Sequence, residues 1–233
     1  MTESRRLVYQ TLENKKPERA PRHVWDIQWT YEQFPQEIQR LKEDYPDDIV
    51  WCPRFLKSDS GCKGDPYAIG TYVDEWGCVF DNKFEGIIGE VKHAQITSDE
   101  WEETEQIAVP KAFLDLDADA INEYCKNTEQ FVLAGSSVRI FERIQFLAGT
   151  EKTLMDLFMD PDSMQPAIQK VHQFFCEELK AWAQTDVDAL FIQDDWGTQI
   201  SLLISPELWR VIFKPLYSCL LYTSPSPRDT ERS

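Results

Sequence analysis

Hydrophobic and polar residues follow two different patterns along the chain. Up to about residue 110 the apolar runs are short and interrupted by proline, glycine and charge, which favours short strands and loops. From about residue 130, short apolar runs alternate with stripes that repeat every three or four residues, a pattern typical of buried strands and helices. The longest stripe predicts a helix that starts at Asp160-Pro161 and buries Met164, Ala167, Ile168, Val171, Phe174, Phe175, Leu179 and Trp182.

The same patterns predict the remaining elements. Helices are expected at 3–14, 35–43 (with Ile38 and Leu41 inward), 117–126, 150–159 and from Pro206, strands at 22–29, 48–53, 130–135 and 187–192, and a hairpin that pairs 72–80 with 86–92. Strands separated by helices pair in parallel, so the sequence predicts a parallel α/β fold, either a barrel or a doubly wound sheet. No G-x-G-x-x-G or G-x-x-x-x-G-K-S/T motif follows a strand, which argues against dinucleotide and P-loop enzymes.

Two adjacent acids end the last predicted strand, in the stretch LFIQDDWGTQ. The carboxyl ends of parallel strands carry the site in α/β folds, so Asp194 and Asp195 are the candidate catalytic residues. They could bind a cation, orient a protonated nitrogen or serve in acid–base steps. The alternative is structural: one acid caps the following loop, and the other pairs with Arg139 or Arg143.

Several residues are candidate substrate contacts around these acids: Trp196, Gln199, Arg143, Glu75, Trp76, Trp25 and Asp26. Trp196 offers a flat apolar wall. Arg143 follows the strand that ends near Gly135 and could hold a carboxylate through its forked donors, or pair with Glu142, Asp194 or Asp195. Trp25 and Asp26 end the first predicted strand, where a tryptophan also suits the core.

The tetrapeptide at 74–77, DEWG, is similar to the later DDWG at 194–197, but its flanks differ and we do not interpret it as a repeat. Within the predicted hairpin, Asp74 and Trp76 share one face and Glu75 points to the other. The hairpin is either an edge element that covers a barrel mouth or a lid that contributes side chains to the site.

Composition narrows the choice of partners. The net charge is −17 and no basic stripe is present, which argues against nucleic acid and anionic membranes and leaves a small-molecule substrate. No apolar stretch reaches membrane-spanning length and the N-terminus lacks a signal-peptide core, so a cytoplasmic protein is expected. The six cysteines form no C-x-x-C pair and His23, His93 and His172 are scattered, so no metal site is predicted from this chain alone.

The last residues, 219–233, differ from the rest. LYTSPSPRDTERS is rich in Ser, Pro, Thr and Arg and has no helical or strand period. It resembles translated sequencing-adapter read-through, and a natural disordered tail is the alternative. We therefore expect the domain to occupy residues 1–218 and the native sequence to continue beyond them.

Four segments together resemble the uroporphyrinogen decarboxylase-like superfamily: LENKKPERAPRHVWD, VDEWGCVF with GIIGEV, FERIQFLAGTEKTLMDLFMDPDSM, and VDALFIQDDWGTQISLLISPELWRVIFKPLY. The resemblance covers residues 5–217. It implies a (β/α)₈ barrel of which this chain holds about the N-terminal half, with the hairpin as an insertion. It also matches Asp194 to the aspartate that the family carries at this strand end.

The superfamily implies two activities. Its decarboxylases remove acetate carboxyls from a tetrapyrrole without a metal and carry an Arg-Gln-Ala-Gly-Arg-type stretch, whereas residues 25–31 here contain no arginine. Its zinc-dependent methyltransferases pass a methyl group from a corrinoid protein to a thiol. Their zinc ligands lie in the second half of the barrel, so zinc would be held only by residues beyond this chain.

We therefore favour the corrinoid-linked methyltransferase branch, with a decarboxylase of porphyrin metabolism as the first alternative. The second alternative is a ligand-binding relative or a fragment without catalytic activity. Because half a barrel exposes strand edges and apolar faces, we expect the isolated chain to aggregate.

Overall fold

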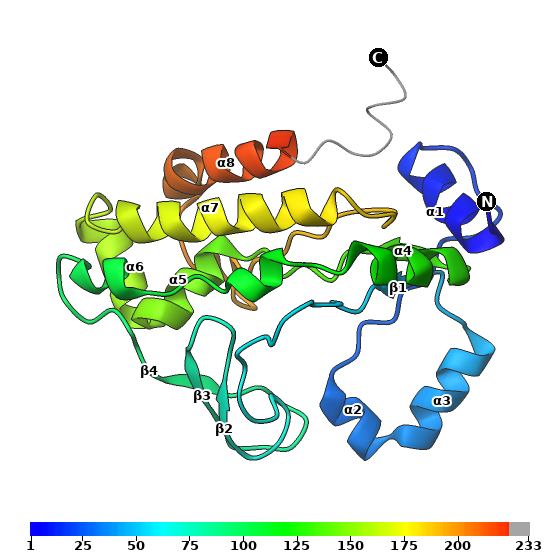
Figure 1. Ribbon diagram of the computed structural model, residues 1–233, viewed down its shortest axis with the longest axis horizontal. Coiled ribbons are helices and arrows are strands. Elements are labelled where there is room, and N and C mark those ends of the chain that lie inside the picture. The colour runs from blue at the N-terminus through cyan, green and yellow to red at the C-terminus, as the bar shows by residue number, and fades with distance from the viewer. Residues whose placement is uncertain (224–233) are drawn as a thin grey trace.

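The structure is a computed structural model that describes residues 1–223 (Figure 1). Its helices are α1 (Glu3–Leu12), α2 (Gln28–Gln33), α3 (Pro35–Asp44), α4 (Ala118–Asn127), α5 (Ile140–Ala148), α6 (Thr150–Met159), α7 (Gln165–Trp182) and α8 (Pro206–Thr223), with 3₁₀ turns at Glu102–Gln106 and Lys111–Leu114. Its strands are β1 (Ile49–Trp51), β2 (Gly70–Val73), β3 (Val79–Asn82), β4 (Glu90–His93) and β5 (Phe131–Leu133).

Three parallel segments form the centre of the fold. Strands β1 and β5 pair in parallel, with Ile49 opposite Phe131. The predicted strand at 187–192 joins the other side of β5 through two isolated parallel bridges, Leu133 to Ala189 and Val138 to Ile192. The parallel α/β arrangement expected from the sequence is therefore present, while the pairs among residues 1–223 do not close a barrel.

An antiparallel sheet of three strands, in the order β2-β3-β4, lies on the opposite side of α5 and α7 from α8 (Figure 1). Part of the expected hairpin is present, because β3 pairs with β4, but the unbroken first strand expected at 72–80 was wrong. Residues 74–77 do not continue a strand; they form the turn between β2 and β3. Asp74 Oδ1 accepts hydrogen bonds from the backbone N–H groups of Trp76 and Cys78, and Gly77 adopts a φ of 79°. This Asx-type turn overrides the alternating pattern.

The main core forms between α5, α7 and α8. All eight apolar residues of the predicted α7 stripe are buried. Trp76 packs edge-on against Phe174 at 5.0 Å between ring centroids, so the β2–β3 turn contacts the same helix. The predicted helix start was wrong, because Asp160 ends α6 and α7 begins only at Gln165, after a turn.

Two further expectations were wrong. No strand forms at 22–29: Trp25 is exposed and α2 begins at Gln28, because this segment gains only isolated hydrogen bonds, such as Asp48 N–H to the carbonyl of Arg22. Leu41 is exposed, although its neighbour Ile38 is buried as expected.

At the end of the chain, α8 runs through the boundary expected at 219 and ends at Thr223. The rest of the predicted tail, 224–233, lies outside the described residues. Across residues 1–223, no helix has both the length and the apolar character needed to cross a membrane.

The approach of β1 to β5 gives a stability prediction. A Cβ atom at Gly135 would lie 2.5 Å from the carbonyl oxygen of Cys52, whereas one at Gly197 would lie 3.5 Å from that of Ser201. We expect Gly135→Ala to lower the free energy of unfolding by about 2 kcal/mol, because the backbone must shift. Gly197→Ala is the matched control, with little expected change. Equal unfolding midpoints in urea would contradict this account.

Candidate functional site

A cavity of about 270 Å³ lies between the carboxyl ends of β1 and β5 and the antiparallel sheet. Arg54 follows β1, Ser137 and Arg139 follow β5, and Arg143 comes from the first turns of α5. Its other walls come largely from the sheet and are mostly aromatic or aliphatic: Tyr72, Asp74, Glu75, Phe80, Ile88, Phe113 and Phe146. This is the end of the strands at which parallel α/β folds place their sites.

Arg143 is buried between two carboxylates. Its Nη1 donates to Asp74 Oδ2, and its Nη2 lies 2.8 Å from Glu75 Oε1. The side chains of Arg143 and Asp74 are 4% and 5% exposed, so both charges are compensated inside the protein. Arg143 does pair with acids, as the structural alternative proposed, but its partners come from the β2–β3 turn and not from Glu142 or Asp194.

Arg54 joins the cavity to a buried acid on α7. Its Nη2 lies 2.8 Å from Glu178 Oε1, and the side chain of Glu178 is fully buried. The N–H groups of Arg54 donate to the carbonyl of Gly135 and to Ser137 Oγ, so neither oxygen of Glu178 receives an aligned hydrogen bond. Burial raises the pKa of Glu178 to about 7. Arg54, the backbone N–H of Ser137 and Arg143 oppose this shift, and Glu75 adds to it.

Asp194 lies at the predicted strand end, where it caps α5. Its oxygens accept the backbone N–H groups of Phe141 at 2.7 Å and Glu142 at 2.8 Å, and the hydroxyl of Tyr217. Burial raises the pKa of Asp194 to about 6, against the lowering effect of Tyr217 and the two backbone donors. The two bonds to N–H groups in the first turn are those a helix N-terminus needs, so this arrangement is a cap supplied from a distant segment.

The residues next to Asp194 point elsewhere. Asp195 and Gln199 are exposed, and Asp195 accepts from the N–H of Gly197. Trp196 stacks on Phe141, with ring centroids 4.7 Å apart, and also packs against Phe213 of α8. None of the three lines the cavity between Arg54 and Arg143.

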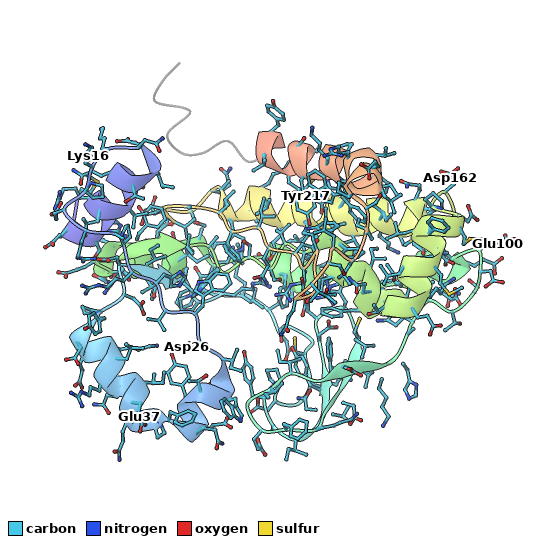
Figure 2. The ribbon with its side chains drawn as sticks, turned by 180° about the vertical axis from the view of Figure 1, so that it is seen from behind. Lys16, Asp26, Glu37, Glu100, Asp162 and Tyr217 are labelled. Atoms are coloured by element: carbon cyan, nitrogen blue, oxygen red, sulfur yellow. The ribbon has the colours of Figure 1, made fainter. Side chains whose placement is uncertain are left out.

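Trp25 and Asp26 line a second cavity of about 520 Å³ along β1, with Trp51 and Lys42. Asp26 is 3.3 Å from Lys42 of α3. Figure 2 shows Asp26 beside α2 and α3, far from Tyr217, which lies where α8 meets α7. The structure therefore does not bring Trp25 and Asp26 together with Asp194 and the arginines.

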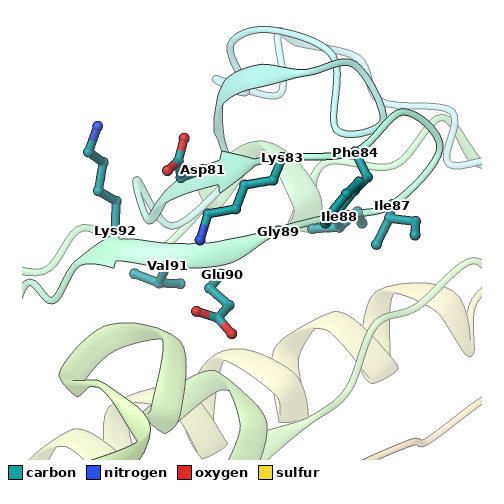
Figure 3. Close-up of a pocket in the computed structure, with 9 residues that line it drawn as sticks. All are labelled: Asp81, Lys83, Phe84, Ile87, Ile88, Gly89, Glu90, Val91 and Lys92. Atoms are coloured by element: carbon teal, nitrogen blue, oxygen red, sulfur yellow. The ribbon is translucent and has the colours of Figure 1, made fainter.

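Two other features of the described residues resemble binding sites. A cavity of about 520 Å³ is lined by residues of β3, β4 and the loop between them, and none of its ionisable residues is buried (Figure 3). His172, Cys176 and Cys219 place their ligand atoms within 4.8 Å of one another between α7 and α8. Cys219 is the first residue of the segment that resembles adapter read-through, so we do not assign a metal site to this cluster.

Arg54 and Glu178 were missed in the sequence. Glu178 had a detectable signal, because it is a charged residue inside the apolar stripe of α7 and is flanked by Phe175 and Leu179. Arg54 follows Pro53 in a stretch that resembles an ordinary loop. Its position depends on the pairing of β1 with β5, which the sequence alone does not specify.

No protein-family model and no curated protein matches the sequence. Among solved structures, the fold is similar to that of a methyltransferase from Methanosarcina mazei, with a TM-score of 0.63 and 12% sequence identity. The alignment covers 97% of this chain and 68% of that one. At this identity the likeness concerns the fold alone: a mixed α/β chain arranged as in that methyltransferase.

The capping role of Asp194 can be tested by stability. We expect Asp194→Ala to lower the free energy of unfolding by about 2 kcal/mol, because two buried N–H groups of α5 lose their acceptor. Asp195→Ala is the neighbouring control and should change it by less than about 0.5 kcal/mol. Chemical denaturation followed by circular dichroism measures both. If both variants match the wild type, Asp194 does not cap α5.

The buried Glu178 predicts a pH dependence. Its folded-state pKa of about 7 lies above the ordinary value of 4.5, so its contribution to stability is complete below pH 4.5 and is lost as pH rises through 7. Between pH 5 and pH 8 the free energy of unfolding of the wild type should fall by about 2 kcal/mol, whereas that of Glu178→Gln should not show this fall. Parallel stability curves for the two proteins across this range would show that Glu178 does not titrate there.

Proposed function

We propose that this chain forms part of an enzyme that transfers a methyl group to a small-molecule acceptor bound at the cavity between Arg54 and Arg143. The observation that carries the proposal is the methyltransferase fold followed by 97% of the chain. The position of the cavity supports it, since parallel α/β enzymes use this end of their strands. In the favoured version the donor is a corrinoid protein and the acceptor is a thiol, as the superfamily resemblance implies.

The roles of the residues follow from their surroundings. Arg54 and Ser137 line the cavity and can contact the acceptor directly, whereas Arg143 is held by Asp74 and Glu75 and shapes the wall. Asp194 positions α5, and with it Arg143, by capping the helix. Asp195 does not line the cavity, so it could contribute to the reaction only through contact with a partner protein.

Zinc would supply a thiolate-stabilising charge in this branch. Among residues 1–223, however, no group of histidines and cysteines lines the cavity, and the one cluster of metal-binding type lies between α7 and α8. The described residues therefore do not fit a zinc centre at this site, and we derive no step through zinc.

Tetrapyrrole decarboxylation is less well supported. A cavity of about 270 Å³ is below the roughly 300–1,000 Å³ of sites for drug-sized ligands, and a tetrapyrrole is larger than such ligands. The three cavity arginines also face four carboxylates of the protein, which leaves too little positive charge for a substrate with many carboxyl groups.

Methyl transfer is tested with the full chain, methylcobalamin and a panel of small thiols. The methyl group forms a bond to sulfur, the cobalt keeps the electron pair of the broken bond, and the thiol proton is released to solvent. We expect a thioether, detected by mass spectrometry, and reduced cobalamin, detected by visible absorbance. Arg54→Gln should lower kcat/KM by about tenfold or more, because a charge contact to the acceptor is lost.

Arg210→Gln serves as the control, since Arg210 is an exposed arginine of α8 away from the cavity. Loss of carboxyl groups from uroporphyrinogen, without methyl transfer to any thiol, would favour the decarboxylase alternative. Inactivity in both assays would favour the second alternative, a ligand-binding relative or a fragment without catalytic activity.

A further inference from the structure

The charges around the cavity do not balance when every acid is ionised. Three arginines, Arg54, Arg139 and Arg143, face four carboxylates, those of Asp74, Glu75, Glu142 and Glu178. In that state the cavity has one excess negative charge and repels an anion. With a proton on Glu178, three positive charges face three negative ones.

Glu178 is the acid of this group best placed to take up that proton. Asp74 is held by Arg143 and two backbone N–H groups, and Glu75 is held by Arg143. Glu178 is fully buried, and neither of its oxygens receives an aligned hydrogen bond. Of these acids, Glu178 therefore requires the least free energy to become neutral, in agreement with its raised pKa.

Protonation of Glu178 removes the negative charge that is paired with Arg54. Glu178 is its acidic partner among the described residues, whereas Arg143 keeps two carboxylates and Arg139 keeps Glu142. The hydrogen bonds of Arg54 within residues 1–223 use Nε and Nη2, which leaves Nη1 for a ligand. The guanidinium lies 4.3 Å from the ring centroid of Phe113, so an apolar wall adjoins the charge.

We propose that the cavity binds a small anion with an apolar body, such as a carboxylate or sulfonate, through Arg54, and that Glu178 takes up one proton as the anion binds. This inference rests on the proposed function, because it takes the cavity to be the site of the methyl acceptor. The anion replaces the charge of Glu178 beside Arg54, and the displaced negative charge is neutralised by the proton.

The other groups near Glu178 do not reverse this coupling. The backbone N–H of Ser137 and Arg143 favour the charged carboxylate, and Glu75 disfavours it. Arg143 and Glu75 are paired with each other at 2.8 Å. On α7 itself, the neighbouring Glu177 is exposed and interacts with Gln173. An anion bound at Arg54 is therefore the main new charge that Glu178 experiences.

Benzenesulfonate is the probe, because it combines a ring with a group that stays ionised throughout the pH range. Calorimetric titration of the full chain, at constant ionic strength and in buffers of different ionisation enthalpy, gives the Kd and the number of protons taken up. We expect the Kd to rise about tenfold from pH 6 to pH 8. Proton uptake should be close to one at pH 8 and close to zero at pH 6.

Variants separate the two residues. Glu178→Gln should bind with the same Kd at both pH values and without proton uptake, while the matched control Glu177→Gln should behave as the wild type. Arg54→Gln should lose binding. Benzenesulfonamide, a neutral probe of similar shape, should bind at least tenfold more weakly than the sulfonate at pH 6.

The proposal is overturned if benzenesulfonate does not bind, if it binds no better than the sulfonamide, or if its Kd is independent of pH in the wild type. Proton uptake that persists in Glu178→Gln would assign the proton to another group. These results are distinct from the methyl-transfer assay: coupled anion binding without methyl transfer would remove the proposed function and leave the site. Methyl transfer together with anion binding that takes up no proton would overturn the proposed coupling and leave the proposed function.

Discussion

The pairing of Arg143 with Asp74 and Glu75 is the interaction on which the site depends. It fastens the β2–β3 turn to the first turns of α5, and so holds the antiparallel sheet over the carboxyl ends of the parallel strands. Such a buried pair does not by itself add stability, because desolvation offsets the attraction between the charges. Its consequence is geometric, since the loss of these contacts would leave the buried side chains of Arg143 and Asp74 without their ionic partners.

The regular elements of the second half could be predicted from the sequence. The α7 stripe, the α8 start at Ser205-Pro206 and the strand at 130–135 depend on local signals, namely periodicity, capping and a buried apolar run. Helix α5 was missed because its cap is not local: the acceptor for its first N–H groups is Asp194, more than 50 residues away. The strand at 22–29 was overpredicted because alternation without a pairing partner does not make a strand.

The candidate site was predicted less well than the fold. The expected end of the strands is where the cavity lies, and Arg143 and Glu75 do belong to it. The other predicted residues do not line it: Asp194, Asp195, Trp196, Gln199, Trp76, Trp25 and Asp26. Adjacency in sequence does not fix the direction in which side chains point after a strand ends. Arg54 and Glu178 become neighbours only through packing of α7 on the β1–β5 pair, a contact between residues more than 100 positions apart.

The net charge of the whole protein and the arginines of the cavity act on an anionic ligand in opposite directions. At a net charge of −17 the surface repels anions, but salt screens this field beyond about 8–10 Å. Aromatic rings line the cavity and one of them, Phe113, lies beside Arg54, so the charge of Arg54 is screened less there than on the open surface. In the proposed coupling, an anion would be selected at short range, where the protonation state of Glu178 sets the local balance of charge.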